Sequence, residues 1–294
     1  GGGSNAGGLV GLINASGNTI NAINNATSSV VVNGGTNVGD IVGRLNTGTL
    51  TNSTSSGAVT GMNNVGGMIG RLYYGALTGS VSTNAVTATG NTTGGLVGFL
   101  EHGSSLLNTS SHTTGLVKGV SYVGGLIGQS QGTVGVAVVA STPTYTTFAS
   151  SNVEASGSYV GGLIGSASGT VTNSSVSGTV TGVASGYSGD YVGGLIGESS
   201  ATSSWNRYIG TLVKARSQTG GLIGRNTNSI TDSYSSGEVQ SNGSSVGGLV
   251  GWTNATITGT TATVGSTTYA TGNVTGNDQT GGLVGYGEYS NAVI

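Results

Sequence analysis

Residues 193–197 read GGLIG, and the same five letters occur at 124–128, 161–165 and 220–224. When Asp is allowed at the second place, Ile or Met at the third and Val at the fourth, the pattern occurs ten times, starting at Gly7, Gly39, Gly66, Gly94, Gly124, Gly161, Gly193, Gly220, Gly247 and Gly281. Successive starts lie 27 to 37 residues apart, and three of the nine intervals are 27 residues long. Self-similarity at such a period indicates a chain built from repeated structural units.

The remainder of the unit also recurs, as in GTLTNSTSSGAVTG at 48–61 and GTVTNSSVSGTVTG at 169–182. Each copy reads as three short strands separated by turns of Gly, Asn and Ser. One unit cannot bury a core by itself, whereas stacked units pair each strand with its equivalent in the next unit. We therefore predict an all-β, parallel β-helix-like β-solenoid of roughly nine to ten coils with a 27-residue base period. It should form a single continuous domain over residues 1–294, with insertions near 130–158 and 253–279.

The composition of the chain supports this prediction and excludes several classes of protein. Glycine accounts for 60 of 294 residues, but glycine does not recur at every third place and there is one proline, which excludes collagen. Only 5% of residues are charged and the net charge is −2, so we expect no basic face for nucleic acid. No apolar run reaches 18 residues, so we expect no membrane span, and without cysteine there is no disulfide framework. A chain rich in Gly, Ser, Thr and Asn with so little charge is typical of secreted surface proteins, and we expect an extracellular or cell-surface location.

The repeated unit resembles a known family. VGGLIG followed by G-x-[IV]-x-[ND]-[SC]-[YSV]-[SA]-x-G-x-V is similar to the GLUG repeat of large bacterial surface and secreted proteins, and the resemblance covers nearly the whole chain. It implies a stalk or an adhesive shaft and supplies no catalytic residue. We expect neither an enzyme nor a bound cofactor.

Strand alternation assigns faces to the residues of the motif, taken as one strand. The third residue points inward and forms a core ladder of Leu9, Ile41, Met68, Leu96, Leu126, Leu163, Leu195, Leu222, Leu249 and Leu283. Asp40 and the charged residues after the motif would then share the outer face, because burying them would be costly. Glu198 and Arg225 lie one period apart, which predicts an ion pair between neighbouring coils.

The same alternation places a second apolar row on the outer face, formed by Val65, Ile69, Val160, Ile164, Val192 and Ile196. A strand that is apolar on both faces is usually covered on both. Either another part of the same chain covers this row, or a neighbouring subunit does and the row is an assembly ridge. Neither end of the sequence shows a capping helix, so we expect open strand edges that stack head to tail on copies of the chain or on adjoining repeats of a longer chain.

A few side chains are candidates for chemistry or for ligand binding. Trp205, Trp252 and Tyr286 could stack on surface glycans, although such aromatic residues also cap turns. Glu101 and His102, with His112 nearby, are the nearest approach to an acid–base or metal-binding group. We expect an extracellular structural protein, a filament-forming subunit or adhesin stalk that assembles through open solenoid ends and the apolar ridge. The alternative is an adhesin module that binds a glycan or a host surface.

Overall fold

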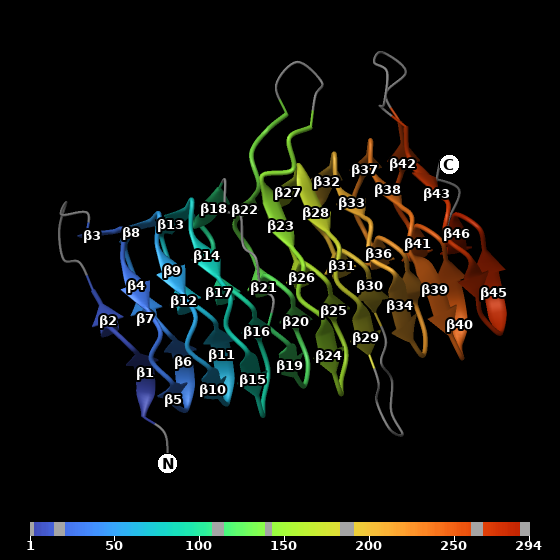
Figure 1. Cartoon of the computed structure of the whole chain (residues 1–294). Helices are drawn as coiled ribbons and strands as arrows, with labels where there is room; N and C mark the ends of the chain where they lie inside the picture. Colours follow the sequence, from blue (N-terminus) through green and yellow to red (C-terminus); the bar gives the residue numbers. More distant parts are fainter. Residues whose placement is uncertain are drawn as a thin grey trace.

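The computed structural model describes residues 3–14, 21–107, 115–138, 143–182, 191–259 and 267–288. Every regular element in these ranges is a β-strand, and all the strand pairs are parallel. The chain winds in successive coils that lie side by side along a rod, as Figure 1 shows. The prediction of an all-β parallel β-solenoid is confirmed.

Two long sheets, sheet A and sheet B, meet at the GGLIG motif. Sheet A contains β1 (Ser4–Gly7), β6 (Thr36–Gly39), β11 (Asn63–Gly66), β16 (Thr93–Gly94), β20 (Val123–Gly124), β25 (Val160–Gly161), β30 (Val192–Gly193), β35 (Thr219–Gly220), β40 (Ser244–Gly247) and β45 (Asp278–Gly281). Sheet B contains β2 (Val10–Ile13), β7 (Val42–Leu45), β12 (Ile69–Leu72), β17 (Val97–Leu100), β21 (Ile127–Ser130), β26 (Ile164–Ala167), β31 (Ile196–Ser199), β36 (Ile223–Asn226), β41 (Val250–Thr253) and β46 (Val284–Gly287).

Two further long sheets, sheet C and sheet E, complete the coil. Sheet C contains β3 (Asn21–Asn24), β8 (Gly48–Thr51), β13 (Gly75–Thr78), β18 (Ser105–Leu107), β22 (Thr133–Val134), β27 (Thr170–Thr172), β32 (Thr202–Ser204), β37 (Ile230–Thr231) and β42 (Ile257–Thr258). Sheet E contains β5 (Val32–Asn33), β10 (Val59–Gly61), β15 (Val86–Ala88), β19 (Val117–Gly119), β24 (Val153–Ala155), β29 (Val180–Gly182), β34 (Leu212–Ala215), β39 (Glu238–Ser241) and β44 (Val274–Thr275).

Two short sheets occupy the side of the coil between sheets C and E. Sheet D, near the N-terminus, contains β4 (Thr27–Ser28), β9 (Thr54–Ser55) and β14 (Val81–Ser82). Sheet F, in the C-terminal half, contains β23 (Thr147–Ala149), β28 (Ser174–Val176), β33 (Arg207–Tyr208), β38 (Tyr234–Ser235) and β43 (Tyr269–Ala270). Most coils therefore have five short strands, where the sequence pattern predicts three.

The insertions lengthen the connections between strands and leave the register intact. Gln129 pairs with Ser166 on the next coil although they are 37 residues apart, as Glu198 pairs with Arg225 at a separation of 27. The extra residues lie between β22 and β23 and between β42 and β43, and of these, residues 139–142 and 260–266 fall outside the described ranges. Equivalent residues therefore stack in columns along the rod.

The GGLIG motif is a corner of the coil. β30 ends at Gly193, Gly194 and Leu195 form a bend, and β31 begins at Ile196. A Cβ atom at Gly193 would overlap the carbonyl oxygen of Ile196, so the close turn requires glycine there. Both bend residues are tied to the next coil, since the amides of Gly194 and Leu195 donate to the carbonyls of Gly220 and Leu222 at 3.2 and 2.8 Å. The recurrence of the pentapeptide follows from the recurrence of this corner.

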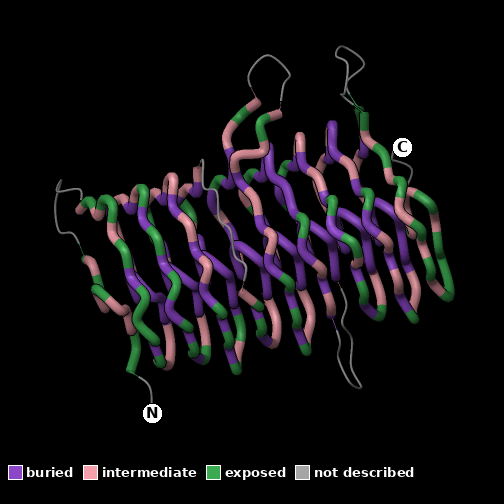
Figure 2. The backbone as a smooth tube through the Cα atoms, viewed as in Figure 1, coloured by how far each residue is buried: buried purple, intermediate pink, exposed green. Residues whose placement is uncertain are grey.

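The corner explains where the predicted core ladder lies. The residues from Ile41 to Leu249 of that ladder are fully buried, and each donates its backbone amide to the equivalent carbonyl of the next coil at 2.8–3.0 Å. Leu9 and Leu283 belong to the two end coils of the described stack, where Leu9 is 49% exposed and Leu283 is partly buried. Figure 2 shows this pattern, with buried backbone along the middle of the rod and exposed backbone at both ends.

The proposed assembly ridge is contradicted by the structure. Val65, Ile69, Val160, Ile164, Val192 and Ile196 are all fully buried within the single chain. The prediction was wrong because strand alternation holds only within a continuous strand, and the bend changes the direction of the chain. The residues before and after the bend therefore both reach the interior, and the chain itself covers them.

Asp40 is a second correction. The sequence reading placed it on the outer face, but its side chain is fully buried. It occupies the second position of the corner, and this position faces the interior. At the equivalent position in another coil, a Cβ atom added to Gly194 would meet the buried ring of Tyr208. The four arginine and glutamate residues after the motif lie on the outer face of sheet B as predicted, and they are partly exposed.

Candidate functional site

The outer face of sheet B carries one column of side chains, formed by the residue that follows each motif. The strand register aligns Leu12, Arg44, Arg71, Phe99, Gln129, Ser166, Glu198, Arg225, Trp252 and Tyr286. Glu198 and Arg225 form an ion pair in which Nη1 lies 2.6 Å from Oε1. The guanidinium of Arg225 also lies 4.7 Å from the centre of the Trp252 ring and 5.6 Å from that of Tyr191, distances at which cation–π attraction operates.

Arg44 and Arg71 are neighbours in the same column, and each has its own partner. Arg71 forms an ion pair with Glu101 through Nε and Oε1, and Arg44 donates from Nε to Oδ1 of Asn46 at 2.6 Å. Glu101 places an opposite charge beside Arg71, and the side-chain amide of Asn46 accepts a hydrogen bond from Arg44. The repulsion expected between like charges on neighbouring strands is thereby reduced.

A second column lies beside the first and was not found from the sequence. It consists of the residue two places before each pair of glycines, which has a positive φ in every coil: Asn5, Asn37, Asn64, Thr92, Tyr122, Tyr159, Tyr191, Gln218, Ser245 and Gln279. Asn64 donates to Asn37 at 2.9 Å and Asn37 donates to Asn5 at 2.8 Å, so the first three form an amide ladder. The recurrence of Asn at this place is a signal that could have been used, because Asn tolerates a left-handed backbone.

Three tyrosines continue this column. The rings of Tyr122 and Tyr159 are stacked with centroids 4.5 Å apart and an interplanar angle of 3°, and Tyr191 follows at 5.1 Å and 39°. Burial, followed by the negative charge of Glu198, raises the pKa of Tyr159 above its usual value. Because the rings of Tyr122 and Tyr159 cover each other's faces, these two tyrosines offer few open ring faces on which a sugar could stack.

The three predicted glycan contacts do not form one site. Trp252 and Tyr286 are partners in the register of sheet B, whereas Trp205 lies at the corner between β32 and β33 with a φ of 55°. One face of Trp252 is approached by Arg225, as described above. The candidate acid–base group is also dispersed: Glu101 pairs with Arg71, His102 is exposed, and His112 lies outside the described residues.

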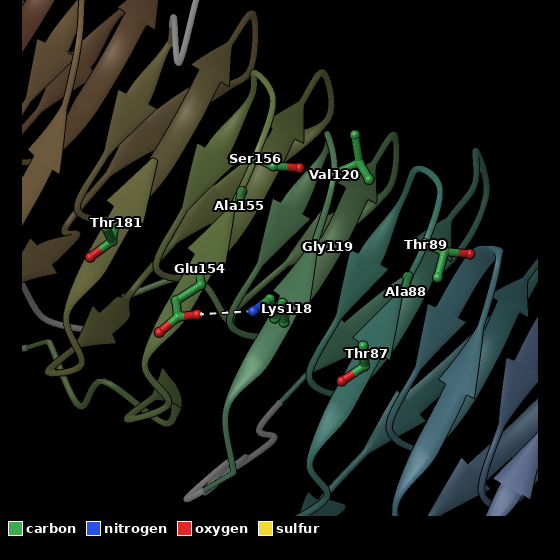
Figure 3. A pocket seen from close by; sticks show the side chains of 10 residues that line it. All are labelled: Thr87, Ala88, Thr89, Lys118, Gly119, Val120, Glu154, Ala155, Ser156 and Thr181. Carbon is green, nitrogen blue, oxygen red and sulfur yellow. Dashed lines mark ion pairs between the residues drawn. The ribbon is translucent and has the colours of Figure 1, made fainter. Parts of the chain in front are cut away.

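A groove of about 580 Å³ runs across the outer face of sheet E, as Figure 3 shows. Thr87, Lys118, Glu154 and Thr181 come from four successive coils, and Lys118 Nζ lies 3.7 Å from Glu154 Oε2. Both side chains of this ion pair are about half exposed. The groove therefore presents hydroxyl groups and an ion pair whose two charges balance. Among the residues that the structure describes, no group of three His, Cys, Asp or Glu side chains could hold a metal ion.

These features define the class of protein: a parallel β-solenoid made of one repeated corner unit, with columns of stacked side chains on its outer faces. Residues 156–181 and 215–240 match the family model of the GLUG motif, and each matched segment contains one GGLIG corner. The chain is thus a β-solenoid that carries GLUG repeats. No curated protein and no solved structure matched the chain.

GLUG repeats on a β-solenoid suggest a surface or adhesin-like repeat protein. Within the described ranges, no helix has the length and apolar character needed to cross a membrane.

Proposed function

We propose that this chain is a shaft segment of an extracellular or cell-surface protein, and that it acts by shape and not by catalysis. One observation carries the proposal: strands of sheets A and B keep their register through ten coils although the repeats differ in length by up to ten residues. Selection for an unbroken rod explains why the extra residues are confined to connections. At about 4.8 Å per coil, ten coils give a shaft on the order of 45 Å long.

The partners of such a shaft are further coils, either from the same polypeptide or from other copies of it. The side-by-side route through an apolar ridge is removed, because those residues are buried. Coil-on-coil stacking remains, and it is supported by the pairing within the chain, where the strands of sheets A and B bond to their equivalents in the next coil. A further coil in the same register would pair the backbone groups of an edge strand in the same way.

The purified protein tests this proposal by small-angle scattering combined with light scattering and negative-stain microscopy. We expect a particle of constant cross-section whose length is about 45 Å for one copy. If copies stack, the length grows in multiples of that value and the cross-section does not change. A particle that widens with concentration at constant length would contradict coil-on-coil stacking, and a compact sphere would contradict the shaft.

The location is tested separately on intact cells that make the protein. We expect an added protease to remove it from the cells while a cytoplasmic marker protein stays intact. Protection of the chain until the cells are lysed would contradict a surface location.

A further inference from the structure

A second hollow, of about 270 Å³, lies on the outer face of sheet F. It crosses β23, β28 and β33, which are neighbours in Figure 1, and the register aligns Phe148, Ser175 and Arg207 across them. A small residue thus lies between two large ones on flanking coils. Those coils are two strand spacings apart, or about 9.6 Å, and the hollow between them, the slot, also receives the guanidinium of Arg207.

Arg207 supplies a positive charge to this slot. Its Nε donates to Ser175 Oγ at 2.9 Å, its Nη1 lies 3.4 Å from the Tyr234 hydroxyl, and its guanidinium lies 3.8 Å from the centre of the Tyr145 ring. None of these partners is a carboxylate. Arg71 and Arg225, by contrast, both pair with a glutamate.

The charge on Arg207 is therefore held in place but is not neutralised. Hydrogen bonds and a ring contact fix the guanidinium, and Nη2 has no hydrogen-bond partner among the described residues. The pKa of Tyr145 is consistent with a positive charge beside its ring. Burial raises this pKa, and the charge of Arg207 opposes the rise. A guanidinium with free N–H groups at a hollow is suited to bind a carboxylate through two parallel hydrogen bonds.

The remaining lining residues favour a ring with hydroxyl groups. Phe148 and Ile209 offer apolar surface, and Ile209 is 42% exposed. Thr144, Ser175 and Ser177 offer hydroxyl groups that can both donate and accept hydrogen bonds. A pyranose ring has an apolar C–H face and a rim of hydroxyl groups, and so it matches both kinds of surface.

We infer that this hollow, the Arg207 pocket, binds a sugar ring that carries a carboxylate, such as a uronic acid unit of an acidic polysaccharide. The carboxylate lies on the guanidinium of Arg207, and the ring lies in the slot between the coils of Phe148 and Arg207. This inference goes beyond the shaft proposed above, since a shaft needs no ligand. It gives one side of the rod an affinity for acidic glycans.

The experiment measures binding by saturation-transfer NMR and titration calorimetry on the whole chain. The probes are the methyl glycosides of glucuronic and galacturonic acid, each compared with its neutral hexoside. We expect at least one acid to bind with a dissociation constant near the millimolar range, as suits one shallow ring site, and its neutral counterpart to bind at least about tenfold more weakly. Higher ionic strength should weaken binding of the acid.

Variants locate the site. Arg207→Gln should lower the affinity for the acid at least about tenfold, and Phe148→Ala should lower it several-fold. Arg44→Gln is the matched control, because Arg44 is an arginine on sheet B whose described partner is also an uncharged side chain but which does not line this hollow. It should leave binding unchanged. Circular dichroism and thermal unfolding of each variant verify the fold, and acetate and an N-acetylglutamate amide serve as further probes.

Several results would overturn the inference. They are no binding of either acid by the folded protein, equal binding of acid and neutral sugar, and an equal loss of binding in Arg207→Gln and Arg44→Gln. Acetate binding as tightly as the sugar acid would indicate a bare anion site, and preference for the glutamate derivative would indicate a peptide site. In both cases the sugar assignment fails.

Discussion

Sheets D and F occupy the same side of the coil but fill the interior behind them differently. Behind sheet D the buried side chains are polar, formed by Ser28, Ser55, Ser82, Asn84 and Asp40. Behind sheet F the equivalent positions include Val176, Tyr208 and Ala270, with a single serine among them at Ser235. The same backbone corner therefore accepts either a hydrogen-bonded polar interior or an apolar one.

The polar interior is organised around Asp40. Its Oδ1 accepts from the Ser28 hydroxyl at 2.5 Å, and its Oδ2 accepts from the amides of Ser56 and Gly57 and from Nδ2 of Asn84 at 3.1–3.2 Å. Four donors converge on one carboxylate, so the cost of removing it from water is offset by charge-assisted hydrogen bonds.

The apolar interior is organised around Tyr208, the largest fully buried side chain described. A Cβ atom added at Gly194, Gly210 or Gly237 would strike its ring, so three glycines make the space for one tyrosine. Its hydroxyl lies 3.0 and 2.8 Å from the carbonyl oxygens of Gly178 and Leu212. What differs between the two regions is which residue fills the space: a carboxylate at the corner in one, an aromatic ring on the facing strand in the other.

The largest effect is expected for Tyr208→Ala, which empties the space behind sheet F. Loss of a large buried side chain between three glycines should lower the free energy of unfolding by about 3–5 kcal/mol, because the glycine backbones cannot collapse into the cavity. Urea unfolding measures this change. Tyr286→Ala, at an exposed ring of sheet B, is the control and should change stability by less than about 1 kcal/mol. Equal losses in the two variants would mean that the ring of Tyr208 does not support the C-terminal coils.

Asp40→Gly should lower stability by about 3 kcal/mol, although it restores the glycine that stands at this place in the other corners. The change removes the acceptor that four donors share. The Ser56 amide still donates to the carbonyl of Ser28, and Asn84 still donates to that of Gly57, but the Gly57 amide and the Ser28 hydroxyl lose the acceptor that the structure gives them. Asp40→Asn keeps part of the acceptor set and should cost less, about 1–2 kcal/mol. Hydrogen exchange measures the effect locally, with the amide of Gly57 expected to lose most protection. If Asp40→Gly is neutral or stabilising, the hydrogen-bonded cage does not hold the N-terminal coils together.

Alkaline pH should lower the free energy of unfolding through Tyr208, by a smaller amount than the two substitutions do. Burial raises the pKa of Tyr208 well above that of a tyrosine in the unfolded chain, which is about 10. Below pH 10 the side chain is neutral in both states, and above it the unfolded chain loses the proton while the folded chain keeps it. Stability should therefore fall as the pH rises, by about 1.4 kcal/mol at pH 11 from this residue alone.

Tyr208→Phe isolates that contribution from those of the other tyrosines. The variant should lose about 1 kcal/mol at neutral pH, because it lacks the buried hydrogen bond, and should show a shallower decline above pH 10 than the parent protein. Parallel pH profiles for the two proteins would show that Tyr208 titrates normally and is not shielded from water.

The same contrast shows how far sequence reasoning reaches in this chain. The spacing of the motif predicts the stack, and the column of leucines follows, because both depend only on which residues recur. Which way Asp40 and Val192 point could not be derived, because this depends on where the strand bends. The five residues of the motif look like part of one long strand until the close approach of Gly193 to Ile196 is known.

The candidate site was harder to predict for a related reason. The pairing of Glu198 with Arg225 follows from the 27-residue period alone, whereas the Arg207 pocket joins Phe148 to Arg207 through one interval of 27 residues and a longer one of 32. A period count cannot align residues on either side of an insertion of unknown placement. Columns within regular repeats are therefore predictable, and sites next to inserted connections are not.

The smallest effect concerns the pair of Glu198 and Arg225, which tests whether side-chain columns stabilise the rod. Both side chains remain partly exposed, at 25% and 32%, so the coupling free energy should be only about 0.5 kcal/mol in spite of the short contact. A double-mutant cycle with Glu198→Gln and Arg225→Gln measures it. Coupling should shrink in high salt, because screening weakens an exposed pair. Coupling that is undiminished in high salt would contradict the description of this pair as an exposed, screened contact.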